Sequence, residues 1–264
     1  MNNRPHIIGI IPARMGSSRF PGKPLAPIHG VPLVGHVYLR AKMCSLLDEV
    51  YIATPDQEIV AYADSIGAKS VIGRNDHRGC SNITGEVLFK IEKETGRTPD
   101  IVVMLQGDEP MITPEMIEMS IKPFLDDPSI EVVNLMAPIK SDEEHQDPNC
   151  PKVVVDRNNF ALYFSREPIP SKKKWKGGEY SRYKQVCVIP FRRDFLVQFN
   201  EWGITPLEEI ESIDMNRVLE YGRKVKMVYE DVETYAVDTP EDLKKVEQKM
   251  ADDPLVARYK NDQA

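Results

Sequence analysis

The 264-residue sequence predicts an α/β fold in which a mostly parallel, mixed sheet is joined to a smaller, partly antiparallel subdomain. Three observations support this prediction. Short apolar segments, such as residues 7–11 and 101–105, are typical of strands that are buried on both faces. Up to about residue 126, such strands alternate with segments of helical periodicity. After that point several strand-like segments follow one another without a helix between them, which favours antiparallel pairing.

The first half of the chain supplies the expected parallel strands and the helices that connect them. Predicted strands cover residues 7–11, 50–53, 69–73 and 101–105. Predicted helices cover residues 32–47 and 82–95, and two more begin at Thr54 and Thr113. Thr54 has the position of an N-cap, because Pro55 follows it and Gln57 is placed to close a capping box. This alternation is typical of a parallel sheet that helices cover on both sides.

The second half is expected to form the antiparallel part and then to end in a helix. Predicted strands cover residues 131–137, 152–155, 161–164, 184–189 and 225–229. A full capping box at residues 205–208 predicts a helix from there to about Tyr221, where Gly222 ends it. Thr239 begins the last predicted helix, and the chain from Asp252 onward is expected to fray.

Composition narrows the classes of function. The net charge is −7 and no basic tail occurs, which argues against nucleic acid as a partner. The four cysteines form no Cys-x-x-Cys pair, so the sequence predicts neither a zinc site nor a disulfide framework. Only about five apolar residues follow the N-terminal segment, too few for a signal peptide or a membrane span. We therefore expect a cytoplasmic protein without membrane insertion.

The loop after the first strand, residues 12–23 (PARMGSSRFPGK), is the main candidate for a binding site. Residues 16–18 (Gly-Ser-Ser) allow a tight turn in which backbone N–H groups converge on an anion. Arg14, Arg19 and Lys23 add three cations, which suit a triphosphate. The alternative is a solvated loop, but open α/β sheets bind ligands at the carboxyl ends of their strands. The loop has neither the P-loop nor the dinucleotide-binding glycine pattern, which disfavours P-loop proteins and nicotinamide oxidoreductases.

Two aspartates offer a site for a hard cation. Asp108 follows the buried strand at 101–105, and Asp238 follows residues 234–237. Near a polyphosphate, such carboxylates are suited to Mg²⁺, which takes oxygen ligands and bridges phosphate oxygens. The alternative for each is a role in a turn or at a helix start, since Glu-Pro follows Asp108 and Thr-Pro-Glu follows Asp238.

Three polar residues are candidates for recognising a second substrate. Gln106 and Gln185 can recognise hydroxyl groups, and Arg166 can hold a carboxylate through two hydrogen bonds. Arg166 could equally pair with Glu167 or Asp156. No Ser-His-Asp or Cys-His set stands out, which argues against a covalent hydrolase.

Six blocks of the chain, in order and with matching spacing, resemble the cytidylyltransferases that activate 3-deoxy-manno-octulosonate (Kdo). They are residues 12–25 (Pro-Ala-Arg-x-x-Ser-Ser-Arg-x-Pro-Gly-Lys-Pro-Leu), 76–77 (Asp-His), 106–110 (Gln-Gly-Asp-Glu-Pro), 161–166 (Ala-Leu-Tyr-Phe-Ser-Arg), 206–208 (Pro-Leu-Glu) and 237–243 (Val-Asp-Thr-Pro-Glu-Asp-Leu). The resemblance implies a Rossmann-like nucleotidyltransferase, usually a homodimer, that forms a CMP-sugar and pyrophosphate from CTP and an acidic sugar.

The resemblance also implies roles for individual residues and for parts of the chain. Arg14 and Lys23 correspond to triphosphate ligands, and Asp108 and Asp238 to the Mg²⁺ carboxylates; these four are the expected catalytic residues. The implied nucleotide contacts come from Ala13, Arg14, Ser17, Ser18, Lys23, Asp76 and Gln106, and the implied acceptor contacts from Gln106, Arg166, Gln185 and Asp214. Residues 1–130 and 222–251 are then the nucleotide-binding core, and residues 131–221 the acceptor-binding and dimerisation subdomain.

The chain departs from the family pattern mainly on the acceptor side. Where the Kdo enzymes have an arginine after the Asp-His block, this chain has Ile83, and Gln185 stands where they have a histidine. Residues 213–217 (Ile-Asp-Met-Asn-Arg) replace Leu-Glu-Gln-Leu-Arg. Kdo, a modified Kdo, another acidic sugar and a phosphonate all remain possible acceptors, because changes in groups that bind hydroxyls alter preference strongly. A non-catalytic nucleotide-binding module is the alternative from another class.

Overall fold

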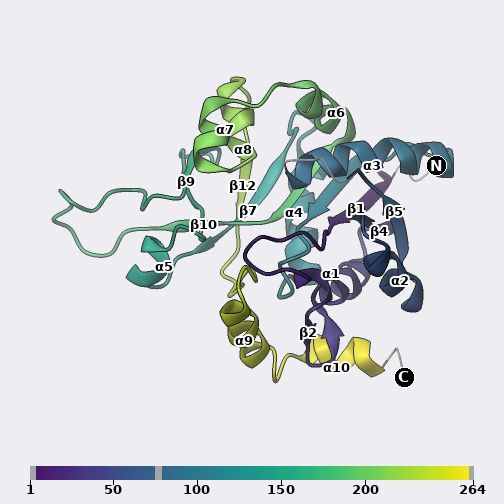
Figure 1. Cartoon of the computed structure of the whole chain (residues 1–264). Helices are drawn as coiled ribbons and strands as arrows, with labels where there is room; N and C mark the ends of the chain where they lie inside the picture. The colour runs from purple at the N-terminus through teal and green to yellow at the C-terminus, as the bar shows by residue number, and fades with distance from the viewer. Residues whose placement is uncertain (1–3, 75–78, 262–264) are drawn as a thin grey trace. The chain divides into compact units, whose positions relative to one another are not determined.

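The computed structural model describes residues 4–74 and 79–261, and the chain folds into two compact units (Figure 1). Unit 1 consists of Met1–Glu118 and Thr234–Ala264, and unit 2 of Met119–Glu233. Unit 1 ends at Glu118 and resumes at Thr234, so each boundary lies 12 residues from the predicted division at 130 and 222. Strand β12 (Lys226–Tyr229) explains the second difference, because it pairs in parallel with β7 (Val133–Pro138) and so belongs to unit 2.

Unit 1 contains the predicted parallel sheet. Its strands are β1 (Ile7–Pro12), β4 (Glu49–Thr54), β5 (Lys69–Ile72) and β6 (Ile101–Leu105), in the spatial order β6-β1-β4-β5. Each neighbouring pair is parallel, with Ile7 opposite Ile101 and Ile8 opposite Glu49. Every residue of β1 and β6 is buried, as expected of central strands. Because parallel strands end at the same edge, the loops after β1 and β6 start side by side.

The other elements of unit 1 are short connections and helices. They are η1 (Lys23–Leu25), the hairpin of β2 (Pro27–Ile28) and β3 (Val31–Pro32), and the helices α1 (Leu33–Lys42), α2 (Gln57–Ser65), α3 (Cys80–Thr95), α9 (Pro240–Lys249) and α10 (Pro254–Asn261). The predicted start of α2 at Thr54 is wrong. Thr54 ends β4, and its hydroxyl accepts the Asp56 N–H at 3.1 Å, so that Asp56 takes the N-cap position and the helix begins at Gln57.

The chain from Asp252 onward was expected to fray, and for residues 252–261 this prediction is also wrong, because Pro254–Asn261 form α10; the last three residues lie outside the described part of the chain. Helix α10 packs on the rest of unit 1 through Val256 and Tyr259, which join a buried cluster with Val237 and Met250. The Tyr259 hydroxyl also hydrogen-bonds the buried ring of His36 on α1. Leu255 packs against the same cluster, so apolar side chains hold this short helix in place.

Unit 2 contains the mixed sheet, in the spatial order β12-β7-β10-β8-β9. Its remaining strands are β8 (Lys152–Val155), β9 (Ala161–Ser165) and β10 (Tyr183–Val186). β11 (Val188–Arg192) is not a strand of this sheet, but its Phe191 forms an isolated bridge with Val132, just before β7. All pairs except β12–β7 are antiparallel, as predicted. Helix α4 (Pro114–Asp126) leads into the unit, which also holds α5 (Asp142–Gln146), α6 (Arg193–Glu201), α7 (Pro206–Glu211) and α8 (Met215–Glu220).

Two predicted elements of unit 2 are each divided in the structure. The strand at 184–189 breaks at Cys187: continuing the β10 register would set Ile189 opposite Val132, but Phe191 takes that place, so two extra residues are accommodated. The helix predicted from Thr205 to Tyr221 is interrupted at Ser212, which has a left-handed φ of 53°. A left-handed residue ends the helical hydrogen-bond pattern, and α8 starts afresh three residues later.

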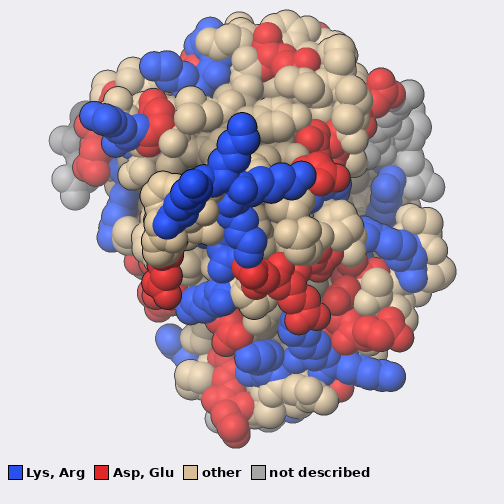
Figure 2. Space-filling model, turned by 90° about the vertical axis from the view of Figure 1, so that its left-hand side faces the viewer, with Lys and Arg blue, Asp and Glu red and all other residues tan. Residues whose placement is uncertain are grey.

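Charged side chains of both signs are interspersed on the face shown in Figure 2. Unit 2 contributes exposed ion pairs such as Lys172 with Asp142 at 2.7 Å and Lys140 with Asp231 at 3.0 Å. Pairs of this kind contribute little to stability, because water and salt screen them. Among the residues that the structure describes, no helix combines the length and the apolarity that a bilayer crossing requires.

Candidate functional site

The loop between β1 and η1 is held in place at both ends. At its start, Ala13 N–H donates to the Ala53 carbonyl at 2.9 Å, and Met15 N–H donates to Asp56 Oδ2 at 2.6 Å. At its end, Gly22 N–H donates back to the Met15 carbonyl at 3.1 Å, and Gly22 itself has a φ of 75°. A positive φ suits glycine, which explains the residue type at this turn. The sequence analysis did not assign Asp56, since its contact with the loop depends on the neighbouring strand.

Within the loop, some of the predicted phosphate donors bond the loop itself. Ser17 N–H donates to the Met15 carbonyl at 2.9 Å, and Ser17 Oγ accepts the Phe20 N–H at 3.3 Å. Arg14 and Ser18 are exposed, whereas Ala13 is buried at the end of the strand. The predicted nucleotide contacts of these residues remain predictions.

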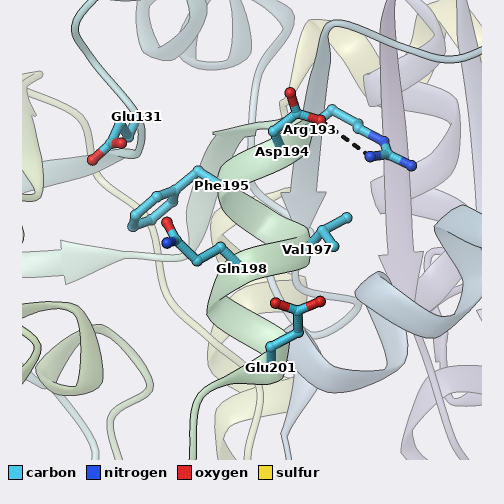
Figure 3. Close-up of a pocket in the computed structure, with 7 residues that line it drawn as sticks. All are labelled: Glu131, Arg193, Asp194, Phe195, Val197, Gln198 and Glu201. Atoms are coloured by element: carbon cyan, nitrogen blue, oxygen red, sulfur yellow. Dashed lines mark hydrogen bonds and ion pairs between the residues drawn. The ribbon is translucent and has the colours of Figure 1, made fainter.

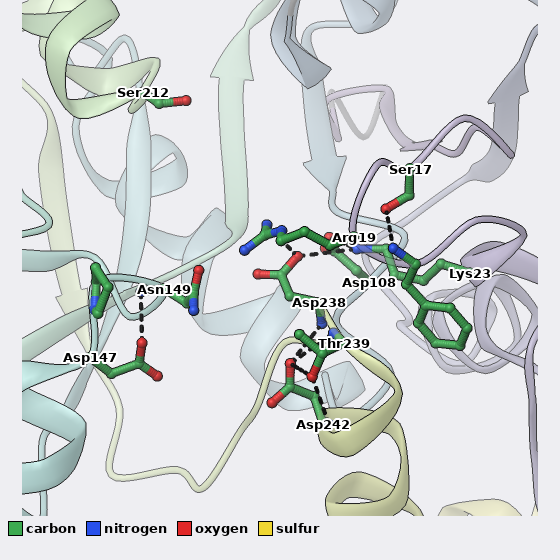
Figure 4. Close-up of polar contacts among 12 residues, drawn as sticks. Ser17, Arg19, Lys23, Asp108, Asp147, Asn149, Ser212, Asp238, Thr239 and Asp242 are labelled. Carbon is green, nitrogen blue, oxygen red and sulfur yellow. Dashed lines mark hydrogen bonds and ion pairs between the residues drawn. The ribbon is translucent and has the colours of Figure 1, made fainter.

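The loop brings Lys23 between two carboxylates (Figure 4). Lys23 Nζ lies 2.8 Å from Asp108 Oδ2 and 3.3 Å from Asp238 Oδ1. Arg19 Nη2 lies 2.9 Å from the same Asp238 oxygen. Two cations of the loop and the two predicted metal ligands therefore form one cluster, although these residues are up to 219 positions apart in the sequence (238 − 19). The sequence analysis named Arg19 as one of three loop cations but gave it no partner.

A close backbone approach and two hydrogen bonds fix the segments that carry the aspartates. A Cβ atom on Gly107 would lie 2.8 Å from the Pro12 carbonyl oxygen, so only glycine lets the loop after β6 pass this close to the end of β1. Val237 N–H then donates to the Asp108 carbonyl at 2.9 Å. The Thr234 hydroxyl donates to buried Glu109 at 3.0 Å. Asp108 and Asp238 are thus positioned through their own backbones.

The segment after Asp238 supports it as well. Thr239 and Asp242 form a capping box at the start of α9, and Asp238 N–H donates to Asp242 Oδ2 at 3.1 Å. The alternative considered from the sequence, a role at a helix start, applies to the backbone of this segment, since Thr239 is the N-cap of α9. The Asp238 carboxylate faces Lys23 and Arg19 instead.

Charge balance governs the chemistry of the cluster. Burial of Lys23 opposes its charged form, but the nearby Asp108 and Asp238 carboxylates outweigh this and raise the pKa of the ammonium group. Asp108 Oδ1, the oxygen that does not face Lys23, is buried and has no hydrogen-bond partner in the described part of the chain. A buried carboxylate oxygen without a donor is unfavourable unless a cation or water binds it. The donor set therefore fits a hard divalent cation.

The described residues hold no group of three or more His, Cys, Asp or Glu side chains that could bind a metal ion together. This agrees with the chemistry of Mg²⁺, which usually takes one or two carboxylates and completes its coordination with water and substrate phosphates. The cluster therefore favours a metal ion whose remaining ligands are water and substrate phosphates.

Other predicted nucleotide-side residues lie near the sheet or outside the described residues. Gln106 directly follows β6 and is half-buried. Asp76 lies outside the described residues. Ile83, which replaces the family arginine, is buried on α3 and packs against Gly73, where an added Cβ would come within 2.8 Å of it. That position therefore serves packing in this chain.

The predicted acceptor residues of unit 2 take part in local networks. Arg166 pairs with neither Glu167 nor Asp156; its guanidinium donates to the carbonyls of Glu211, Pro148 and Ser212 at 2.6, 2.8 and 3.2 Å. Gln185 Nε2 donates to Asn134 Oδ1 at 2.6 Å, and Asp214 takes the N-cap position of α8. Their predicted contacts with an acceptor remain predictions.

Glu211 is the centre of a polar network that sequence reasoning missed. Its carboxylate accepts hydrogen bonds from the Tyr163 hydroxyl at 2.9 Å, the Ser165 hydroxyl at 2.8 Å and the Arg166 N–H at 2.7 Å. Burial works against the charged form, yet these donors together lower the pKa of the Glu211 carboxyl group. The network connects the end of α7 to β9 and holds Arg166 in position.

A shallow hollow of about 400 Å³ beside α6 is not suited to a triphosphate (Figure 3). Glu131, Asp194 and Glu201 line it, and the guanidinium of Arg193 lies 3.1 Å from Asp194. A site whose lining is mainly acidic repels a polyanion. The cluster around Lys23 is therefore the stronger candidate.

Comparison with known proteins shows the family of the chain. A family model described as Cytidylyltransferase matches residues 8–227. The 3-deoxy-manno-octulosonate cytidylyltransferase of Pelobacter propionicus is 41% identical over 253 residues, covering 92% of this chain and 97% of the relative. The 8-amino-3,8-dideoxy-manno-octulosonate cytidylyltransferase of Shewanella baltica strain OS195 is 40% identical over 245 residues, covering 92% and 98%.

Solved structures show the same likeness. A CMP:2-keto-3-deoxy-manno-octonic acid synthetase complexed with CTP has a TM-score of 0.85 and 36% identity, covering 93% of this chain and 98% of that one. A thymidylyltransferase-like structure from Bacillus anthracis, at 17% identity and a TM-score of 0.66, shares the fold. From the family match, and from two relatives of about 40% identity aligned over nearly the whole chain, it follows that this protein belongs to the cytidylyltransferase family.

Proposed function

We propose that the protein transfers CMP from CTP to a hydroxyl group of a Kdo-like acidic sugar and releases pyrophosphate. The observation that carries this proposal is the cluster of Lys23, Asp108 and Asp238 at the end of the parallel sheet, with contacts of 2.8 and 3.3 Å. The cluster occurs in a chain of the cytidylyltransferase family whose relatives are named for Kdo and for its 8-amino derivative.

The proposed mechanism depends on positioning and on charge neutralisation. Arg14 and Lys23 bind the triphosphate and stabilise the negative charge that develops on the leaving pyrophosphate. The carboxylates of Asp108 and Asp238 would hold Mg²⁺, and the buried, unpartnered Oδ1 of Asp108 supports this assignment. When bound, Mg²⁺ lowers the pKa of the attacking hydroxyl and neutralises phosphate charge. The chain therefore needs no separate general base among its side chains.

The acceptor is proposed to contact Gln106, Arg166, Gln185 and Asp214. Gln185 is already hydrogen-bonded to Asn134 at 2.6 Å, which orients its amide. Relatives that act, by name, on Kdo and on 8-amino-3,8-dideoxy-manno-octulosonate are similar to this chain to nearly the same degree, at 41% and 40% identity. Both sugars therefore belong in an acceptor panel, beside unrelated sugar acids and a phosphonate.

The test is pyrophosphate release from CTP with each acceptor, in Mg²⁺ and in EDTA. We expect turnover with Kdo or its 8-amino derivative, and loss of turnover by at least about 100-fold in Asp108→Asn with CTP binding retained. Asp252→Asn changes an exposed aspartate in the same way and is the matched control. CTP binding without pyrophosphate release for any acceptor would instead indicate a non-catalytic nucleotide-binding module. Equal rates with Kdo and unrelated sugar acids would remove the Kdo-like assignment.

The proposal includes a homodimer. Unit 2 exposes large apolar side chains, among them Leu162 and Ile210 at 62% and 76% of their surface, and burial against a second copy would remove them from water. Light scattering on the purified protein should give about twice the 30.0 kDa chain mass. A single-chain mass at micromolar concentration would contradict this part of the proposal.

A further inference from the structure

The position of Lys23 has a consequence for how the site takes up its metal. Its ammonium group contacts both proposed metal ligands, at 2.8 Å from Asp108 and 3.3 Å from Asp238, and only 12% of its side-chain surface is exposed. Arg19 adds a second positive charge at 2.9 Å from Asp238. The two carboxylates thus face two cations of the chain itself, and the four charges cancel.

A cluster with no net charge has little attraction for a divalent ion. An ion bound to Asp108 Oδ1 and to the Asp238 carboxylate would still lie within about 6 Å of the ammonium nitrogen, because the two oxygens of one carboxylate are close together, and like charges at that separation repel. The ammonium group is held there by two carboxylates, and its low exposure limits screening by solvent. Lys23 and a divalent cation therefore compete for the same carboxylates.

A triphosphate changes this balance. It brings several negative charges, and its oxygens are strong acceptors for an ammonium group. Lys23 is the first residue of η1 and lies at the end of the loop that is proposed to bind the phosphates. Its ammonium group can therefore leave the carboxylates and contact a phosphate without the unfolding of a helix or strand. Phosphate oxygens also supply further ligands for the metal. Nucleotide binding thus both removes the competitor and adds ligands.

We propose that Lys23 is an internal counter-ion that keeps divalent cations away from Asp108 and Asp238 until the triphosphate of CTP takes over its ammonium group. Metal binding is then conditional on nucleotide binding, and the two carboxylates do not hold a divalent ion in the absence of substrate. This inference rests on the proposed function, because it takes the two aspartates as metal ligands and the loop as the triphosphate site.

The test is a titration of the full-length protein with Mn²⁺, which suits the same oxygen ligands as Mg²⁺ and whose free form is measured by electron paramagnetic resonance. Without CTP, we expect weak binding to the wild-type protein and binding at least about tenfold tighter to Lys23→Met. Lys23→Arg, which keeps the charge, should bind as weakly as wild type. Lys244→Met removes an exposed lysine of α9 and should also match wild type.

The outcomes separate this inference from the proposed function. In one outcome, the wild-type protein with saturating CTP takes up more Mn²⁺ than CTP alone does, but without CTP Lys23→Met binds Mn²⁺ no more tightly than wild type. The proposed competition between Lys23 and the metal ion is then wrong, whereas the proposed metal site is retained. If wild type takes up no Mn²⁺ even with CTP, the proposed metal role fails and the inference fails with it. Melting curves identify any unfolded variant, and Lys23→Gln replaces Lys23→Met if that variant does not fold.

Discussion

Gly107 allows a quantitative test of how the site is assembled. A Cβ atom at this position would lie 2.8 Å from the Pro12 carbonyl oxygen, 3.5 Å from Ala13 Cβ and 3.6 Å from Ile11 Cγ2. Ordinary contact begins at 3.4 Å, so Gly107→Ala must move the two backbones apart by about 0.6 Å (3.4 − 2.8). The nearest atom is a backbone carbonyl at the end of a buried strand, which has little freedom to yield.

This displacement acts on Asp108, the next residue along the chain. Overpacking of this kind costs about 1–3 kcal/mol of unfolding free energy. A shift of this size at a reacting centre lowers kcat/KM by about 10–100-fold, because the reaction depends on alignment. The assays are pyrophosphate release and thermal melting, with Gly178→Ala as control, since an added Cβ there meets nothing within 4 Å. Wild-type kcat/KM and melting temperature in Gly107→Ala would refute the close-approach argument.

Three further predictions concern the support of unit 1. Asp56→Ala removes the carboxylate that accepts the Met15 N–H at 2.6 Å. We expect the KM for CTP in steady-state kinetics to rise about tenfold, because the loop loses this support. An unchanged KM would mean that this hydrogen bond does not order the loop. Burial and nearby Arg40 lower the pKa of His36 to about 4 from 6.5, so the stability it contributes is full above pH 6.5 and is lost as the pH falls towards 4. The loss of unfolding free energy between pH 6.5 and pH 4 amounts to about 3 kcal/mol. The unfolding free energy of His36→Gln, measured with urea, should lack this part of the pH dependence, and a pH dependence equal to that of wild type would contradict the assignment. Tyr259→Phe leaves the His36 ring without its hydroxyl partner and should cost about 1–3 kcal/mol by the same measurement, whereas no loss would show that the hydroxyl adds nothing to the docking of α10.

Sequence reasoning predicted the elements whose signals are local. The unrelieved apolar runs of β1 and β6, and the helix start at Thr239, depend on neighbouring residues alone, and the structure confirms them. The predicted convergence of Lys23, Asp108 and Asp238 is also confirmed. Parallel strands direct the loops after β1 and β6 to one edge of the sheet, whereas residues 231–238 form no strand, and the hydrogen bond from Val237 N–H to the Asp108 carbonyl brings Asp238 to the same place.

The failures arose where distant contacts decide. Helix α10 has weak local signals, and burial of Tyr259 in a cluster that includes Ile28 and Leu33, more than 200 residues earlier in the chain, holds it in place. The helix predicted through Ser212 is divided at that residue. Arg166 Nη2 donates to the Ser212 carbonyl, and the Glu211 carboxylate accepts the Arg166 N–H beside β9; no local sequence pattern reveals these contacts. Asp56 and Gly107 were likewise missed as supports of the site, since their importance lies in which strand end they meet.

The cluster also shows how a chain with a net charge of −7 can prepare a site for a polyanion. Unpaired cations in a loop would attract phosphate, but they would also be free to bind other anions or to pair elsewhere on an acidic surface. Here Arg19 and Lys23 are paired with Asp238 and Asp108 at 2.9 and 2.8 Å. The same carboxylates that hold the cations in place are the proposed metal ligands. In the proposed mechanism, Lys23 passes to the phosphate and the carboxylates pass to the metal ion. Every charge would then stay compensated from substrate binding to pyrophosphate release, and both signs of charge would be needed in one site.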